Sequence, residues 1–326
     1  MAGEPFVIDA ALTAMAVNYH NPDVTLIADQ VMPRVDVGDQ LYEYDYFPPE
    51  EVFTVPDTTI GRRGAPNEVE FSAEERTAKV VDRGLDSTVP ERDIAAAKAQ
   101  KRNKRSSYDP EARAVEGLTQ LVQLDRELRV AGVVQSSANY AGNTQTLAGT
   151  SQWSDYDNSD PLTDVSDACD STFIARPNIA VMGRKVFTKL SMHPVLVEGV
   201  MATGAKRGKI TRQQMADLFE LDEVLVGDSF FNTARKGQVG AYDRVWGKFF
   251  ALLHRNRAAQ NKGTQPTWGF TAEWRANGGS KAMVAGRFKN PKGGGLLGGT
   301  TVRAGEFVEE HVMAPQTGFL FENAIL

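Results

Sequence analysis

The spacing of apolar residues predicts one long helix near the middle of the chain. From Val115 to Ala131, apolar side chains recur at intervals of mainly three and four, which places them on one face of a helix. Asp109 is a suitable N-cap, and Pro110 suits the first helical position, where no amide proton is needed. We therefore expect an amphipathic helix over about residues 110 to 136, with one apolar stripe that packs across a sheet.

Two alternating stretches before this helix predict a long β-hairpin. In the segment Leu41–Tyr46, three tyrosines fall on one face of a strand and two acidic residues on the other. A second alternating run starts at Glu68 and continues to Leu85, after a loop rich in proline and glycine. We expect these two runs to pair with each other.

The composition of this hairpin indicates that it needs a partner surface. Both strands are heavily charged, and an isolated two-stranded ribbon is only marginally stable in water. Every charged residue from Asp36 to Asp57 is acidic. The loop and the return strand carry the basic residues Arg62, Arg63, Arg76 and Lys79. This segregation favours an arm that docks by charge complementarity, while a solvated hairpin is the simpler alternative.

The remaining pattern is that of a mixed α+β protein. A helix is expected over residues 8–17, and a basic helix followed by a linker over residues 91–107. Residues 136–160 are rich in Ser, Asn, Gly and Asp and indicate a boundary or an extended loop. The second unit is expected to hold helices at 161–173, 184–190 and 212–219, strands at 178–183, 223–226, 245–253 and 267–274, and a closing pair of strands at 301–312 and 318–321.

The composition is that of a folded protein and excludes a disordered, a collagen-like and a disulfide-stapled chain. The 326 residues carry 36 Lys and Arg against 42 Asp and Glu, which gives a formal net charge of -6. Cys169 has no partner cysteine, so no intrachain disulfide is expected. No run approaches the ~18 apolar residues of a membrane span, and no basic stretch opens the chain. We expect a soluble protein without a signal peptide.

No pattern of residues predicts a catalytic, cofactor or metal site. Gly293, Gly295 and Gly298 have the spacing of a dinucleotide fingerprint, but a turn precedes them and a strand follows them. The four histidines are scattered, without a second ligand at metal spacing. The aromatic residues from Trp246 to Trp274 are most simply core residues. A pocket for a soluble hydrolase or transferase is the alternative interpretation of these aromatic residues.

The basic run from Lys98 to Arg105 is the candidate for contact with nucleic acid, because phosphate neutralisation needs clustered cations. No aromatic residue interleaves this run, and the chain as a whole is acidic. A dedicated nucleic-acid-binding protein normally has a basic balance. We therefore favour a solvated or intersubunit role for this run over direct contact with DNA.

Several long segments resemble the major capsid proteins of tailed bacteriophages, which have the Hong Kong 97-type fold. They are residues 53–71, from Phe53-Thr-Val-Pro to Glu-Val-Glu-Phe71, residues 150–156 (Thr-Ser-Gln-Trp-Ser-Asp-Tyr), residues 176–183 (Arg-Pro-Asn-Ile-Ala-Val-Met-Gly) and residues 245–248 (Val-Trp-Gly-Lys). The order of arm, hairpin, basic segment, long helix, α+β unit and terminal strands is also similar. The resemblance spans nearly the whole chain and implies a shell-building protein without an active site.

The resemblance also implies how the chain divides into domains. An N-terminal arm (1–36) would be followed by the extended loop (37–85), a peripheral domain with the long helix as its spine (86–164), an axial domain (165–275) and a return to the peripheral domain (276–326). In the family the extended loop lies over a neighbouring subunit, which would explain why the hairpin lacks a core of its own. The candidate intersubunit contacts are Tyr42, Tyr44, Glu50, Glu51, Arg62, Arg63, Arg76, Lys101, Arg102, Lys104 and Arg105.

The function that the resemblance implies is that of a head protein and not of an enzyme. Copies would form hexamers and pentamers of an icosahedral shell, which would enclose double-stranded DNA without sequence-specific binding, without a membrane and without cofactors. Assembly is expected in the host bacterial cytoplasm, with the shell part of the virion. A portal protein is an expected partner, and a scaffolding and a decoration protein are further candidates. An encapsulin-like compartment shell is the main alternative, and an enzyme with a Trp-rich pocket is a weaker one.

Two features depart from some members of this family. Only about 35 residues precede the hairpin, so a scaffold is expected to be a separate protein or absent. Lys79 is the only lysine of the hairpin and lies away from its tip, so covalent crosslinking through the extended loop is not expected.

Overall fold

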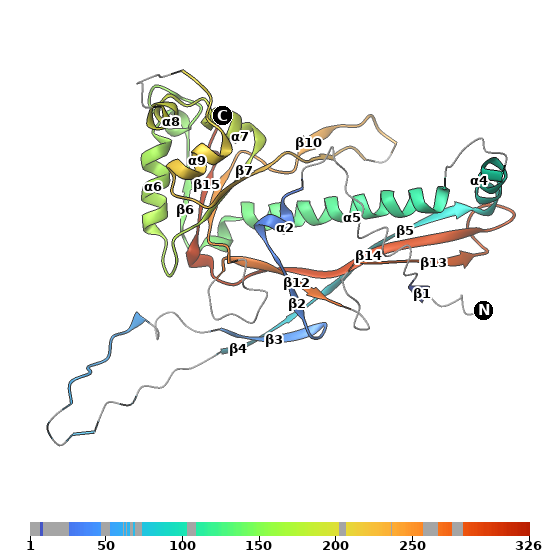
Figure 1. Cartoon of the computed structure of the whole chain (residues 1–326), viewed down its shortest axis with the longest axis horizontal. Helices are drawn as coiled ribbons and strands as arrows, with labels where there is room; N and C mark the ends of the chain where they lie inside the picture. The colour runs from blue at the N-terminus through green and yellow to red at the C-terminus, as the bar shows by residue number, and fades with distance from the viewer. Residues whose placement is uncertain are drawn as a thin grey trace.

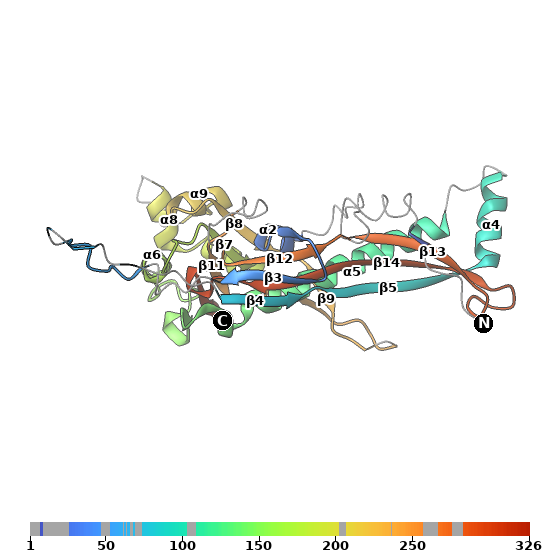
Figure 2. The same cartoon turned by 90° about the horizontal axis from the view of Figure 1, so that it is seen from below.

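Two sheets organise the chain in the computed structural model, one beneath a long helix and the other among short helices (Figure 1). The structure describes residues 7–8, 26–46, 53–60, 62, 64–65, 68, 74–102, 109–201, 207–235, 237–256, 267–275 and 283–326. Both views show an elongated molecule with the short helices at one end and α4 (Glu91–Arg102) at the other (Figures 1 and 2). A hairpin projects from the end that carries the short helices.

The long helix is α5 (Pro110–Gln135), as the apolar pattern predicts. The Asp109 side chain accepts hydrogen bonds from the amides of Glu111 and Ala112, at 3.0 and 3.3 Å, which confirms the predicted N-cap. The apolar stripe of α5 packs on the long sheet through Val115, Leu118, Val122, Met283, Ala285, Val302 and Ala304. Burial of this stripe fixes the helix along the sheet.

The long sheet is six-stranded and is built around β14 (Gly299–Val312). Its other strands are β1 (Val7–Ile8), β13 (Val284–Asn290), β12 (Gly269–Trp274), β2 (Arg34–Val37) and β5 (Val81–Pro90). β14 pairs antiparallel with β13 and then β12 along one edge, and with β5 along the other. Its 14 residues therefore connect the distal end of the molecule to the five-stranded unit.

The second sheet is five-stranded and forms the core of the other end. Its order is β6 (Thr144–Thr146), β15 (Gly318–Glu322), β11 (Phe250–Leu253), β7 (Ile179–Gly183) and β8 (Glu223–Gly227). The short helices at this end are α6 (Pro161–Ser171), α7 (Arg184–Leu190), α8 (Pro194–Val200) and α9 (Arg212–Leu218). The Trp153 ring packs against Phe250 and Phe321 at centroid distances of 5.2 and 5.0 Å. A short ribbon of β9 (Phe230–Asn232) and β10 (Tyr242–Arg244) extends from this unit.

The predicted hairpin is formed by β3 (Leu41–Tyr46) and β4 (Glu74–Lys79), which pair only with each other among the described strands. Together with the described residues between them, these strands are called the extended hairpin below. The expectation that the return strand runs to Leu85 is wrong. Val80 is 1% exposed and interrupts the strand, and residues from Val81 onward pair with β14 in the long sheet.

Other differences follow from tertiary pairing. The closing strands do not pair with each other, because β14 lies in the long sheet and β15 in the five-stranded one. Val7–Ile8 form strand β1 against β13, whereas a helix was expected from residue 8, and the rest of that predicted helix lies outside the described residues. The segment 136–160 is not a free loop, because it contains β6 and the buried Trp153.

The sequence pattern also misses or misplaces several short elements. β13 falls in the Gly- and Lys-rich stretch, whose composition resembles a loop but whose backbone is paired along β14. Helix α8 and the β9–β10 ribbon are too short for a clear period. The strand expected over 245–253 begins only at Phe250. The residues before it place the Trp246 indole over Gly227. A Cβ at Gly227 would lie 2.0 Å from this ring, so the close contact requires glycine there.

Candidate assembly surfaces

Two tyrosines fix the base of the extended hairpin to the long sheet. Tyr42 is 9% exposed and packs in a cluster with Val80 and Phe270. The Tyr44 hydroxyl lies 2.6 Å from Nε2 of His311, and the two rings meet edge to face at 4.9 Å. Both tyrosines are therefore engaged within the chain, and their predicted contact with another copy stays a prediction.

The ionisation of these side chains follows from their burial. Burial lowers the pKa of His311, and the nearby guanidinium of Arg76 lowers this pKa further. Burial raises the pKa of Tyr42 to about 12, with smaller contributions from Tyr44 and Glu309. The imidazole of His311 is therefore neutral at neutral pH.

The outer part of the extended hairpin exposes apolar side chains. Phe53 is 52% exposed, Val55 is 88% exposed and Ile60 is 54% exposed. The Phe53 ring touches that of Phe173 beyond α6 at a centroid distance of 4.7 Å. Exposed apolar side chains that follow one another on a projecting arm indicate a surface that another molecule covers.

The other predicted contact residues lie in three places. Arg62 is exposed in the outer part of the hairpin, and Arg76 is exposed on β4. Lys101 and Arg102 are exposed in the last turn of α4, at the distal end of the molecule. Glu50, Glu51, Arg63, Lys104 and Arg105 lie outside the described residues. The structure therefore brings the predicted residues to opposite ends and not to one site.

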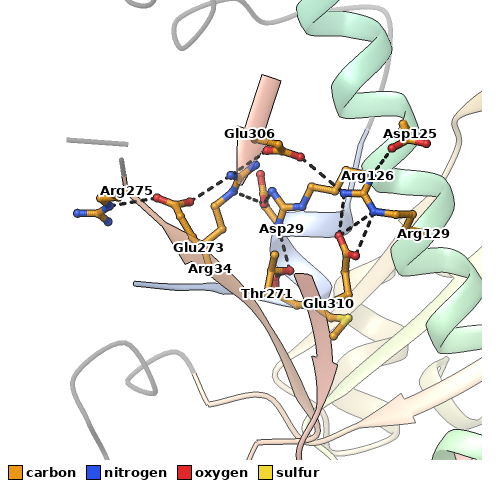
Figure 3. A network of polar contacts seen from close by, with 11 residues as sticks. Asp29, Arg34, Asp125, Arg126, Arg129, Thr271, Glu273, Arg275, Glu306 and Glu310 are labelled. Atoms are coloured by element: carbon orange, nitrogen blue, oxygen red, sulfur yellow. Dashed lines mark hydrogen bonds and ion pairs between the residues drawn. The ribbon is translucent and has the colours of Figure 1, made fainter. Parts of the chain in front are cut away.

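A network of charges, which the sequence does not predict, joins the long helix to the sheet and is mostly buried except at Asp29 (Figure 3). Its members are Asp29, Arg34, Arg126, Arg129, Thr271, Glu273, Glu306 and Glu310. Arg34 reaches Glu273 and Glu306, each at 3.1 Å, and Arg129 holds both carboxylate oxygens of Glu310. Burial alone would raise the pKa of Asp29, but Arg126 and Arg34 outweigh burial and hold this pKa below its ordinary value.

This network could not be predicted from the sequence, because its members are far apart along the chain. One signal was available: Glu309 and Glu310 are consecutive in a strand, so they point to opposite faces. The structure confirms this, since Glu310 pairs with Arg129 on the helix side and Glu309 with Arg83 of β5. Which face the helix covers is decided by packing, and the burial of Glu310 follows from it.

Glu127 on α5 ties three segments together. Its carboxylate accepts hydrogen bonds from the amides of Ile27 and Ala28 at 3.0 and 2.8 Å, and from the indole of Trp246 at 2.5 Å. Burial raises the pKa of Glu127, although these hydrogen bonds act in the opposite direction. The residue holds α2 (Ala28–Val31) and the segment before β11 against the long helix.

The aromatic residues that offered an enzyme pocket are packed as core. Trp246 and Trp268 are each 1% exposed, and Phe250 is fully buried. Burial raises the pKa of the Cys169 thiol, which keeps it protonated and unreactive. The glycines 294, 295 and 298 adopt positive φ angles in the turn between β13 and β14, a hairpin and not a strand-to-helix connection. No group of three metal-ligand side chains lies together in the part of the chain that the structure describes.

None of the described helices combines the length and the apolar character needed to cross a membrane. Among the same residues, an open hollow of about 340 Å³ lies between α2 and α5, and one of about 420 Å³ between α4 and β13. The first is lined by Leu26, Leu121, Leu124 and Phe230 beside the charged network.

Comparison with known proteins shows which proteins this chain is similar to. No family model matches the chain. The major capsid protein of Pseudomonas phage JBD67 is 42% identical over 327 residues, covering 100% of this chain and 99% of that protein. The major capsid protein of Burkholderia phage BcepMu is 25% identical over 279 residues, or 83% of this chain and 85% of that protein.

Solved structures share the fold at lower sequence identity. A phage-related protein from Bordetella bronchiseptica has a TM-score of 0.70 at 19% identity and covers 98% of this chain and 99% of its own. The capsid of cyanophage P-SCSP1u has a TM-score of 0.59 at 8% identity, covering 93% and 90%. The encapsulin complex of Synechococcus elongatus has a TM-score of 0.52 at 9% identity, covering 97% and 95%. Full-length identity and the shared fold together establish that the chain belongs to the phage major capsid proteins with the Hong Kong 97-type fold.

Proposed function

We propose that copies of this capsid protein form hexamers and pentamers, which close into an icosahedral shell around double-stranded DNA. The observation that carries the proposal is the extended hairpin. Its base is anchored by Tyr42 and Tyr44, whereas its outer part exposes Phe53, Val55 and Ile60. A neighbouring copy would cover these side chains and supply the core that the hairpin lacks.

We extend the proposal to the division of the chain into a peripheral and an axial domain. The long sheet with α5 would form the peripheral domain, and the five-stranded unit would form the axial domain around the symmetry axes. Strand pairing suggests that β12 belongs to the peripheral domain and β15 to the axial one, which shifts the boundaries expected from the sequence.

The shell would act without catalysis, and it would enclose DNA without reading its sequence. The net charge of -6 argues against tight binding to phosphate, since an acidic chain repels it. We expect assembly in the host bacterial cytoplasm and contact with a portal protein at one vertex. A separate scaffolding protein and a decoration protein are further candidate partners.

The proposal is tested by deleting residues 50–66 from the otherwise complete chain. We expect subunits with an unchanged far-ultraviolet spectrum that form no closed shells in negative-stain electron microscopy, because the docking segment is missing. The wild-type chain expressed alone should give closed shells, tubes or free capsomers. Normal shells from the deletion variant would contradict the docking role of the hairpin.

An encapsulin-like compartment is the second candidate, since the chain shares its fold with an encapsulin. The contents of particles from infected cells separate the two functions. Nuclease-protected DNA is expected for a virion shell. A copurifying enzyme without DNA would instead favour the compartment.

A further inference from the structure

The extended hairpin touches the five-stranded unit of its own chain through two aromatic rings. The Phe53 ring lies 4.7 Å, centroid to centroid, from the ring of Phe173, which comes after the end of α6. Resting on the proposed function, we propose that Phe173 is a positioning residue, which fixes the direction of the extended hairpin before a neighbouring copy binds it.

Phe173 is presented by a tight turn of unusual geometry. The amide of Ala175 donates a 3.0 Å hydrogen bond to the carbonyl of Phe173, and Ile174 between them has a φ of 75°. This combination is the rare and strained form of the γ-turn. A positive φ is especially unfavourable for a β-branched residue such as isoleucine. Because backbone strain of this kind is concentrated at functional positions, the turn indicates that the place of Phe173 has a use.

Contacts with other elements hold the turn on both sides. The amide of Phe173 donates a 3.2 Å hydrogen bond to the carbonyl of Gln316, in the connection between β14 and β15. The carbonyl of Arg176 accepts a 2.8 Å hydrogen bond from Nδ1 of His254, and the Arg176 side chain pairs with Glu220 at 3.3 Å. Strained backbone persists only where its surroundings fix it, so the turn gives Phe173 a defined position on the body.

The apolar side chains of the turn do not belong to the core. Phe173 is 47% exposed and Ile174 is 36% exposed. Neither residue is a member of a buried cluster in the part of the chain that the structure describes. Two consecutive apolar side chains that face water on a held turn, with a second exposed ring against one of them, indicate a contact surface.

This contact gives the extended hairpin a second point of attachment. Its base is held on the long sheet by Tyr42 and by Tyr44, whose hydroxyl lies 2.6 Å from Nε2 of His311. Phe53, nine residues beyond Tyr44, contacts the five-stranded unit instead. Both views show α6 at the end of the molecule from which the hairpin projects (Figures 1 and 2). A segment attached at one point can swing, whereas attachment to two units fixes its direction.

The geometry of the contact suits positioning. Both rings stay about half exposed, and Val55 and Ile60 farther along the hairpin are 88% and 54% exposed. The side chains that a neighbouring copy would cover therefore stay accessible while the direction of the hairpin is set. Ordering a segment before it binds lowers the entropy that is lost on binding, so a positioned hairpin would bind faster and more tightly.

A latch that holds the hairpin back is the alternative role of the same contact. A latch would have to cover the docking side chains, but the contact covers only part of Phe53 and leaves Val55 accessible. The two roles predict opposite effects when the Phe173 ring is removed. Shells should form more slowly if the ring positions the hairpin, and faster if it restrains the hairpin.

Pulsed electron paramagnetic resonance tests the positioning in dissociated subunits. Spin labels are attached at Ile60→Cys on the hairpin and at Asp167→Cys on α6, both exposed, in full-length chains that also carry Cys169→Ala. One narrow distribution of the distance between the labels is expected. Phe173→Ala should widen this distribution by about twofold or more, because the aromatic contact is lost. Phe173→Leu keeps an apolar contact and should widen it less.

The rate of shell formation tests whether the positioning serves assembly. Light scattering follows unlabelled wild-type, Phe173→Ala and Phe230→Ala chains. For Phe173→Ala the initial rate should fall by about twofold to tenfold, the factor that one aromatic contact contributes. The finished shells should look normal in electron microscopy. Phe230 is 49% exposed on the β9–β10 ribbon, so Phe230→Ala removes a similar ring away from the hairpin and should change neither the rate nor the distances.

Circular dichroism of all the variants checks that the subunits fold. An unchanged distance distribution for Phe173→Ala would overturn the proposal, as would faster formation of shells. Slower assembly with an unchanged distribution would also overturn it, and would assign Phe173 to a contact with another copy. Wild-type chains that form no shells would contradict the proposed function itself, whereas the distances in dissociated subunits would still show whether Phe173 positions the hairpin.

Discussion

The long helix and the extended hairpin place their side chains in opposite ways. On α5, Arg126 and Glu127 are at most 2% exposed, and their partners lie within the same chain. On the hairpin, Val55 is 88% exposed, although it is apolar. The two regions therefore differ in role. The helix stabilises the fold of a single copy, whereas the hairpin exposes apolar side chains that only another molecule can cover. Substitutions in the first should change folding, and those in the second should change assembly.

The largest effect is expected from Glu127→Ala. The substitution leaves the amides of Ile27 and Ala28 and the indole of Trp246 without their acceptor. Each orphaned buried donor costs about 1–3 kcal/mol, so the free energy of unfolding should fall by about 3 kcal/mol or more. Urea unfolding of dissociated subunits measures this.

The matched variant on the hairpin is Val55→Ser, which should change the free energy of unfolding by less than about 0.5 kcal/mol because the side chain is exposed. A loss of stability from Val55→Ser similar to that from Glu127→Ala would break the comparison between the two regions.

A smaller effect is expected where the hairpin joins the body. Tyr44→Phe removes the hydroxyl that lies 2.6 Å from His311 and should lower the free energy of unfolding by about 1 kcal/mol. Tyr242→Phe on the exposed β10 strand is the control and should have no effect. If Tyr44→Phe changed only the yield of shells, the base of the hairpin would belong to the assembly surface and not to the body.

The smallest effect concerns pH. The pKa of His311 is lowered by burial and by Arg76, so the unfolded chain takes up a proton at this histidine first as the pH falls below about 6.5. The contribution of His311 to stability is therefore present above the pKa of the unfolded chain and is lost as the pH falls toward the folded one. Unfolding of wild type and His311→Gln at about pH 7.5 and about pH 5 checks this.

The stability difference between the two chains should shift against the wild type at the lower pH. The pKa of His193 is also lowered by burial, but this residue is present in both chains and cancels from the difference. A difference that stays constant with pH would show that the base of the hairpin does not sense protonation.

Local patterns were enough to predict the elements with a strong period or cap. The helix of Pro110–Gln135 and the strand of Leu41–Tyr46 were predictable because apolar spacing and the Asp109 cap depend only on neighbouring residues. The resemblance to phage capsid proteins also rested on the sequence alone, because it was seen in long continuous segments. The burial of Trp246, Phe249 and Phe250 was also predicted, because large aromatic side chains are most simply core residues.

Tertiary structure decided whatever depends on partners distant in sequence. Strand β13 has the composition of a loop and becomes a strand only because β14 supplies its hydrogen bonds. From the sequence alone, Arg34, Arg129 and Glu310 would be predicted to lie on the surface. In the fold α5 covers the sheet, which buries Glu310 and leaves the two arginines partly exposed. The separation of the acidic strand β3 from the basic last turn of α4 is likewise a property of the folded molecule. The sequence specifies the sign of each charge, but only folding decides how far apart the two segments lie.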